Sequence, residues 1–158
     1  MIAEGESAPD FTLPDQDGSE VTLSELRGQT VVLYFYPRAD TPGCTVQACG
    51  VRDRRADYEK ADARVLGVSP DTVDDVAKFA GKFDLDFTLL ADADHAVAEA
   101  YGAWVEKSMY GKKYMGVQRS TFLIDPEGKI ARVFPKVSPR THDDVVLEAL
   151  ADLAAAAP

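Results

Sequence analysis

The most apolar stretch of the chain runs from Thr30 to Tyr36, where β-branched and aromatic residues follow one another without a charged residue. Strands that are buried on both faces have this continuous pattern, whereas half-exposed strands alternate between apolar and polar residues. We therefore predict that 30–36 is the central strand of a sheet. Shorter runs of the same kind predict further strands at 64–69, 87–90, 120–124 and 129–134.

Apolar residues at helical spacing occupy segments between and after these runs. From Thr141 to Ala154, for example, Val146, Leu150 and Leu153 form one stripe, which is typical of a helix that packs on a sheet. Further helices are predicted at 42–60, 72–83 and 94–101. Alternating strands and helices, followed by a strand pair and a last helix, indicate an α/β fold with a central mixed β-sheet and helices on both faces.

Turn signals show which strands are joined directly. Asp15–Gly18 lies between two short strands and predicts an N-terminal β-hairpin. Asp125–Gly128 joins the strands at 120–124 and 129–134 into another antiparallel hairpin. A further pair of short strands is expected between Trp104 and Val117.

Length and composition limit the class of protein. With 158 residues, of which 46% are apolar and 28% charged, the chain is predicted to form a single domain over residues 1–158. The formal charge of −10 argues against nucleic acid or an anionic membrane surface as a partner, because phosphate groups would repel the chain. No apolar run is long enough to span a bilayer and the first residues lack the features of a signal peptide, so a cytoplasmic location is expected.

Cys44 lies where a helix is predicted to start. Pro37 ends the central strand, and Thr41–Pro42 follows after a short loop. The Thr41 hydroxyl can cap free N–H groups, and proline suits the first helical position because no partner is needed there for its missing N–H. In the first turn, free N–H groups and the positive end of the helix dipole favour a thiolate. We therefore predict a reactive Cys44 rather than the small buried apolar residue that a lone intracellular cysteine usually is.

The second cysteine, Cys49, lies five residues further along the predicted helix. Five helical residues rotate by about 140° and rise by about 7.5 Å, which separates the two Cα atoms by roughly 8.6 Å. A disulfide needs Cα atoms within about 7 Å, so an intact helix forbids a bond between Cys44 and Cys49. Either at least one turn unwinds, which Gly50 makes easier, and the pair is a redox switch, or Cys49 only packs against the sheet. The spacing leaves both alternatives open.

The pattern Pro37-x-x-x-Thr41-x-x-Cys44 resembles the active-site signature of the peroxiredoxins. The longer run from Tyr34 to Asp53 resembles the bacterioferritin-comigratory (peroxiredoxin Q) subfamily. The resemblance implies a thioredoxin-like fold and a thiol-dependent peroxidase that needs no metal and no other cofactor. It continues over nearly the whole chain, through 87–90, 106–108, 122–125 and 142–147.

The resemblance also implies a reaction sequence. Cys44 would attack the O–O bond of hydrogen peroxide or an organic hydroperoxide and become a sulfenic acid, which condenses with a nearby thiol to a disulfide. Cys49 matches the helix position used for this step in part of the subfamily, so an intrachain disulfide is expected. Thioredoxin, or glutaredoxin, would then reduce the disulfide. The protein is expected to be a monomer or a weak homodimer.

Several residues around Cys44 receive roles from the resemblance. An arginine from a distant strand completes the peroxiredoxin site, and the matching position here is Arg119, whose charge would favour the thiolate and stabilise the transition state. The Thr41 hydroxyl would contact the peroxide or the sulfur in addition to capping the helix. Backbone N–H groups of Gly43 and Cys44 would help to bind the peroxide, and Pro37 would shield the thiolate.

Three other interpretations use the same residues. A thiol–disulfide oxidoreductase usually carries Cys-x-x-Cys, whereas four residues separate Cys44 from Cys49. A metal site built from these cysteines with His95 and His142 lacks the close ligand pairs typical of zinc, and both histidines are expected at the surface near helix starts. A redox sensor or holdase on the same fold would show oxidation of Cys44 without efficient turnover by a reductant.

Overall fold

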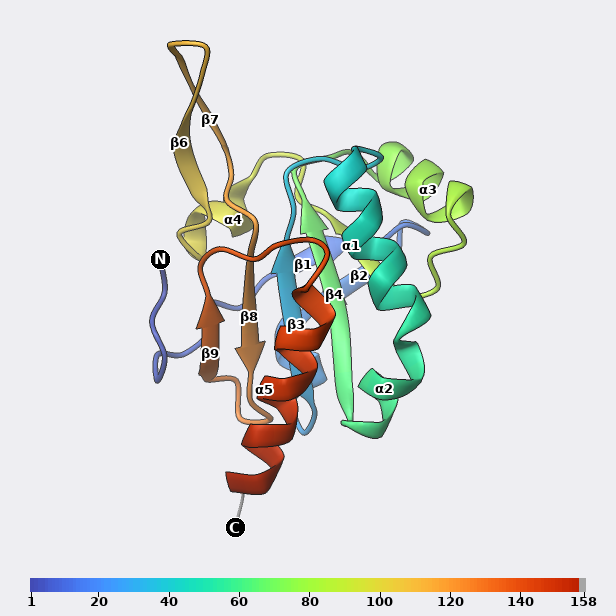
Figure 1. The fold of residues 1–158 in the computed structure, drawn as a ribbon, viewed down its shortest axis with the longest axis vertical. Helices are drawn as coiled ribbons and strands as arrows, with labels where there is room; N and C mark the ends of the chain where they lie inside the picture. The colour runs from blue at the N-terminus through green and yellow to red at the C-terminus, as the bar shows by residue number, and fades with distance from the viewer. Residues whose placement is uncertain (157–158) are drawn as a thin grey trace.

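The computed structural model describes residues 1–156 and has a five-stranded sheet at its centre (Figure 1). Its strands are β3 (Thr30–Phe35), β4 (Ala63–Ser69), β5 (Thr88–Ala91), β8 (Ser120–Ile124) and β9 (Ile130–Phe134). The strand order is β5-β4-β3-β8-β9. β3 runs parallel to β4 and antiparallel to β8, which confirms the predicted mixed sheet.

Side chains of β3 alternate between the two faces of the sheet and divide the core into two halves. Val32 and Tyr34 pack with four helices on one face, whereas Val31 and Leu33 pack with a fifth helix and the N-terminal segment on the other. From Val31 to Phe35 no side chain is more than 2% exposed, so the continuous apolar run is a strand buried on both faces. The four helices are α1 (Pro42–Asp53), α2 (Arg55–Lys60), α3 (Val73–Lys82) and α5 (His142–Ala156), and the fifth is α4 (Ala96–Ala100).

Two strand pairs and a short 3-10 helix complete the architecture. β1 (Thr12–Pro14) and β2 (Glu20–Thr22) form the predicted N-terminal hairpin, and the short 3-10 helix η1 (Leu23–Leu26) follows it. β6 (Trp104–Met109) and β7 (Lys112–Val117) form a separate antiparallel pair that projects from the body of the molecule (Figure 1). None of the helices in the described part of the chain is long and apolar enough to cross a membrane.

The predicted helix 42–60 is interrupted, which corrects the sequence-based expectation. Arg54 has φ −100° and ψ 15°, outside the helical region, and separates α1 from α2. Neither proline nor glycine marks this position, so the local sequence carries no signal for the break. Beyond it, α2 lies against β4 and buries Tyr58, which is 2% exposed. Burial of the Tyr58 ring stabilises the fold and accompanies the break between α1 and α2.

Candidate active site

Cys44 lies where the centre of the sheet meets the start of α1. β3 ends at Phe35, and a short loop leads to Pro42, so Cys44 is in the first turn of the helix. Its side chain belongs to the core on this face of the sheet and is 2% exposed. Free N–H groups at this end of a helix favour a negative charge on the sulfur.

Arg119 reaches Cys44 from the neighbouring strand. β8 is antiparallel to β3 and pairs Ser120 with Phe35, so the residue before β8 lies beside the loop that leads into α1. The Arg119 guanidinium donates a hydrogen bond from Nη2 to Cys44 Sγ at 3.3 Å. The sheet therefore brings together two residues that are 75 positions apart in the sequence.

Gln47 holds the other arm of the guanidinium. Arg119 Nη1 donates to Gln47 Oε1 at 2.5 Å, and Gln47 is fully buried. Because a planar guanidinium held at two nitrogens has a fixed orientation, Gln47 aims Arg119 at the sulfur of Cys44. Sequence reasoning missed Gln47, although one signal was present: it is the polar member of the buried stripe that also contains Ala48 and Val51.

Gly43 leaves room for the guanidinium. A Cβ at this position would stand 3.2 Å from Arg119 Nη2 and 3.5 Å from Pro139 Cγ. Pro139 belongs to the segment between β9 and α5, in which the Val137 N–H donates to the Arg119 carbonyl at 3.3 Å. This segment borders the site, and nothing in the local sequence indicated its role.

Thr41 precedes α1 but does not cap it with its side chain. The hydroxyl donates to the Arg38 carbonyl at 2.9 Å and makes no hydrogen bond to the N–H groups of the helix. The predicted side-chain cap is therefore wrong, because the hydroxyl closes the preceding loop instead. Since its proton is used in that bond, the oxygen keeps its lone pairs for an incoming donor.

Hydrogen bonds fix the loop that carries Pro37 and Thr41. The N–H of Tyr36 continues the pairing of β3 with β4 by donating to the Val68 carbonyl at 3.0 Å, and the half-buried Pro37 then ends it because it has no N–H. The Ala39 N–H donates to Asp71 Oδ2 at 2.8 Å, which ties the loop to the turn after β4. Cys44 therefore follows a loop that is anchored to the sheet.

Cys49 lies on the same helix as Cys44 and is not bonded to it. α1 is continuous from Pro42 to Asp53, both thiols are free, and Cys49 is half-buried. The geometric argument from helix spacing therefore applies to this state, in which no disulfide joins the two cysteines.

Lys107 of β6 adds a second positive charge near the sulfur. Its stem passes Gly116 of β7, where an added Cβ would stand 3.3 Å from Lys107 Cδ. Burial and the nearby charge of Arg119 lower the pKa of Lys107, and the neighbouring Cys44 opposes this shift. The site is thus locally basic on a chain with a formal charge of −10.

The alternative metal site is not assembled. Within residues 1–156, no group of three or more His, Cys, Asp and Glu side chains is arranged to hold a metal ion. His95 stacks on Trp104 with ring centroids 3.9 Å apart. His142 is fully buried, with Nε2 3.0 Å from Thr121 Oγ1, so its expected surface position is wrong. A polar residue at the start of a helix is exposed only when no neighbouring element covers it. The sheet covers His142.

Comparison with known proteins identifies the family. Residues 5–133 match the model of the AhpC/TSA family. The chain belongs to the AhpC/TSA family. This peroxiredoxin is 52% identical over 146 residues to peroxiredoxin Bcp from Escherichia coli K12, with 92% of this chain and 94% of that protein covered. It is 44% identical over 152 residues to peroxiredoxin Bcp from Bacillus subtilis, with 96% and 97% covered.

Solved structures agree with this assignment. The bacterioferritin comigratory protein of Xanthomonas campestris, whose structures concern its alkyl peroxide reduction activity, has a TM-score of 0.90 at 36% identity and covers 96% of this chain and 99% of its own. Peroxidoxin BcpB from Mycobacterium tuberculosis has a TM-score of 0.85 at 40% identity, with 96% and 98% covered. The thioredoxin-like fold and the peroxiredoxin Q subfamily are thereby confirmed, and the chain is a thiol-dependent peroxidase.

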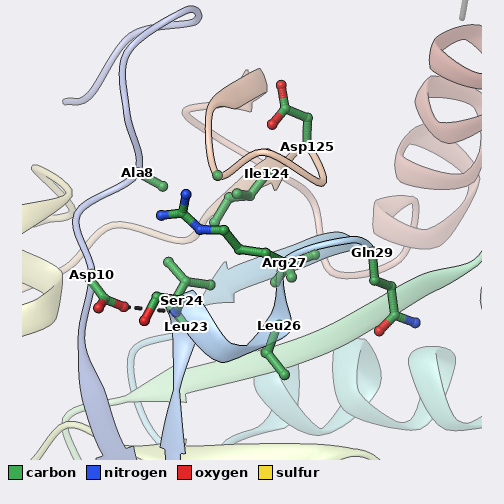
Figure 2. Close-up of a pocket in the computed structure, with 11 residues that line it drawn as sticks. Ala8, Asp10, Leu23, Ser24, Leu26, Arg27, Gln29, Ile124 and Asp125 are labelled. Carbon is green, nitrogen blue, oxygen red and sulfur yellow. Dashed lines mark hydrogen bonds between the residues drawn. The ribbon is translucent and has the colours of Figure 1, made fainter.

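A pocket near the other end of the peroxiredoxin sheet, close to the start of β3, carries no comparable chemistry (Figure 2). Asp10 faces Ser24 there and accepts a hydrogen bond from its N–H at 2.9 Å, and the Arg27 side chain extends across the pocket beside Ile124. The free space is about 10 Å³, which is room for about one water molecule. With no thiol among its lining residues, this pocket offers no second site for peroxide reduction.

We expect Gly43→Ala to slow the reaction of Cys44 with hydrogen peroxide by about tenfold. The added methyl group would stand 3.2 Å from Arg119 Nη2, so the guanidinium has to move by a few tenths of an ångström, which disturbs its hydrogen bond to the sulfur. Stopped-flow measurement of the second-order rate constant tests this. Gly81→Ala is the matched control, because that glycine of α3 has no atom within 4 Å of the added Cβ. An unchanged rate for Gly43→Ala would mean that Arg119 tolerates the displacement.

Proposed function

We propose that this peroxiredoxin reduces hydrogen peroxide and organic hydroperoxides with Cys44 as the peroxide-reactive thiol and Cys49 as the resolving thiol. The observation that carries the proposal is the hydrogen bond of 3.3 Å from the Arg119 guanidinium to the buried Cys44 sulfur in the first turn of α1. A thiolate is the nucleophilic form of cysteine, and a fixed cation together with free N–H groups stabilises it.

In the first step, the Cys44 thiolate attacks the terminal oxygen of the hydroperoxide. An S–O bond forms, the O–O bond breaks, and the leaving alkoxide or hydroxide takes up a proton, so that sulfur is oxidised and peroxide is reduced by two electrons. Arg119 and the N–H groups of Gly43 and Cys44 stabilise the charge that develops on the peroxide oxygens. The Thr41 oxygen, whose proton is bonded to the preceding loop, accepts the O–H of the substrate, and Pro37 limits access of water.

In the second step, Cys49 attacks the sulfur of the Cys44 sulfenic acid. A disulfide forms and water leaves, which requires α1 to open because the helix keeps the two cysteines too far apart. A dithiol protein, thioredoxin or glutaredoxin, then reduces the disulfide by thiol exchange. Such a cycle suits a monomer or weak homodimer in the cytoplasm, where thiols are kept reduced.

Intact mass measured before and after one equivalent of hydrogen peroxide tests the two roles. Wild type should lose two hydrogens, because a disulfide closes. Cys49→Ser should gain one oxygen, because the sulfenic acid has no internal partner. Cys44→Ser should remain unchanged.

Two results would contradict the proposal. If wild type gains oxygen without closing a disulfide, Cys49 does not resolve the intermediate. If the Cys44 disulfide forms but neither thioredoxin nor glutaredoxin supports turnover, the protein is a redox sensor rather than a peroxidase driven by these reductants.

A further inference from the structure

A largely buried carboxylate, that of Asp143, lies directly beside the residue that follows Cys49. A Cβ added at Gly50 would overlap Oδ2 of Asp143, so the absence of a side chain at Gly50 lets the carboxylate of α5 rest against α1. The Asp143 side chain is 13% exposed. Its other oxygen accepts a hydrogen bond from the hydroxyl of Tyr58 on α2. One carboxylate thus contacts both helices that flank the break at Arg54.

His142 links the Asp143 carboxylate to the central sheet. Nδ1 of His142 lies 3.5 Å from Oδ1 of Asp143, and Nε2 of the same ring lies 3.0 Å from Thr121 Oγ1 on β8. Burial, together with the Asp143 charge, raises the pKa of Tyr58 well above its usual range, so the phenol stays protonated and donates. Hydrogen bonds to charged, poorly solvated acceptors are stronger than neutral ones.

The ion pairs between α2, α5 and the residue at the helix break are more exposed than this hydrogen bond. Arg54 pairs with Asp57 at 2.8 Å and with Asp144 at 2.9 Å, but these side chains are between 40% and 75% exposed. Exposed ion pairs contribute little to stability because water and salt screen them. The hydrogen bond from Tyr58 to Asp143 is therefore the least exposed of the polar contacts that join α2 to α5, and Asp143 carries it to α1 through its contact with Gly50. On the other side of α1, Arg52 donates from Nη1 to the Phe83 carbonyl at 2.5 Å.

We propose that the hydrogen bond from Tyr58 to Asp143 restrains the Cys49 end of α1 and sets the rate at which Cys49 reaches oxidised Cys44. The inference rests on the proposed function, in which Cys49 resolves Cys44. Tyr58 and Asp143 are positioning residues, since neither touches the peroxide. A slower closure leaves the sulfenic acid available to a second peroxide molecule, which converts it to sulfinic acid. The same restraint therefore sets how much peroxide inactivates the enzyme.

Tyr58→Phe tests the restraint by removing the hydroxyl and keeping the ring. We expect the oxidation of Cys44 by peroxide to keep its wild-type rate, while closure of the disulfide becomes about tenfold faster because a charge-assisted hydrogen bond no longer opposes it. Rapid mixing with hydrogen peroxide, followed by acid quench and intact mass, separates the two steps. The fraction of sulfinic acid at high peroxide should fall in parallel.

Tyr101→Phe is the matched control. Tyr101 is also fully buried, and its hydroxyl donates to the Pro9 carbonyl at 2.7 Å, but it packs in the half of the core on the opposite face of the sheet. This variant loses a buried tyrosine hydroxyl without touching α1, so both rates should equal those of wild type. Asp143→Asn keeps the shape of the acceptor and lowers its charge, and it should accelerate closure by a smaller factor than Tyr58→Phe.

The possible failures are distinguishable. If wild type closes the disulfide and Tyr58→Phe closes it no faster, the restraint is refuted while the proposed function stands. If Tyr58→Phe and Tyr101→Phe accelerate closure equally, general loosening of the core explains the effect and the restraint is again refuted. If wild type forms no disulfide, the proposed role of Cys49 fails and the restraint fails with it.

Discussion

Arg119→Gln is expected to slow the reaction of Cys44 with hydrogen peroxide by about 10²- to 10³-fold, the loss usual for one preorganised donor in an active site. The variant removes the cation that donates to Cys44 Sγ at 3.3 Å, so both the thiolate and the charge developing on the peroxide lose stabilisation. The second-order rate constant from stopped-flow mixing measures the effect, and Cys49→Ser as background confines it to the first step.

Arg119→Lys separates charge from geometry. Lysine keeps the positive charge but cannot donate to Gln47 and Cys44 at the same time from a planar fork. We expect Arg119→Lys to react with hydrogen peroxide about tenfold to 10²-fold more slowly than wild type, and faster than Arg119→Gln. Arg132→Gln is the control, because Arg132 is a half-buried arginine of β9 whose guanidinium, within residues 1–156, donates only to the carbonyl of the adjacent Ala131. If both Arg119 variants react at the wild-type rate, the guanidinium does not stabilise the thiolate or the transition state.

Gly67→Ala is expected to lower the free energy of unfolding by about 2 kcal/mol, a typical cost of overpacking a core. Gly67 lies in β4 between Tyr34 of β3 and Leu89 of β5. A Cβ there would stand 2.9 Å from Tyr34 Cζ and Oη and 3.0 Å from Leu89 Cδ2. Both neighbours are fully buried, so neither can move away without disturbing the core. Urea unfolding at equilibrium gives the change.

Gly81→Ala provides the opposite outcome in the same assay. Gly81 is exposed near the end of α3, and an added Cβ meets no atom within 4 Å. Alanine is the better helix former, so the free energy of unfolding should rise by about 0.5 to 1 kcal/mol. Equal stability of the two variants would mean that the core at Gly67 relaxes more than its packing indicates.

Local patterns in the sequence determined the framework of this peroxiredoxin. The apolar run 30–36 contains β3, which ends one residue earlier than predicted, at Phe35. The turns Asp15–Gly18 and Asp125–Gly128 are hairpin connections in which Gly18 and Gly128 have φ of 81° and 90°. Thr41–Pro42 marks the start of α1 correctly. Each of these features depends on residues within a few positions, through the side-chain period of a strand, the fixed φ of proline or the positive φ open to glycine.

The family resemblance extended the sequence analysis to Arg119, which no local pattern selects. The resemblance did not indicate that the Arg119 guanidinium pairs with Gln47 or that it fits over Gly43. Both contacts follow from the register of β8 against β3. Arg119 contacts Gln47 across 72 positions and Cys44 across 75. Spacing in the sequence cannot predict such contacts, because they depend on which strands become neighbours.

Only the tertiary structure decided three other features. The helix break at Arg54, the loop contact of the Thr41 hydroxyl and the burial of His142 all differ from the local expectation. In each case a distant or preceding segment offers a partner: β4 for the aromatic ring of Tyr58, the Arg38 carbonyl for a hydroxyl, and Thr121 for an imidazole. Local propensities differ by about 1 kcal/mol or less per residue, so one such contact is enough to override them.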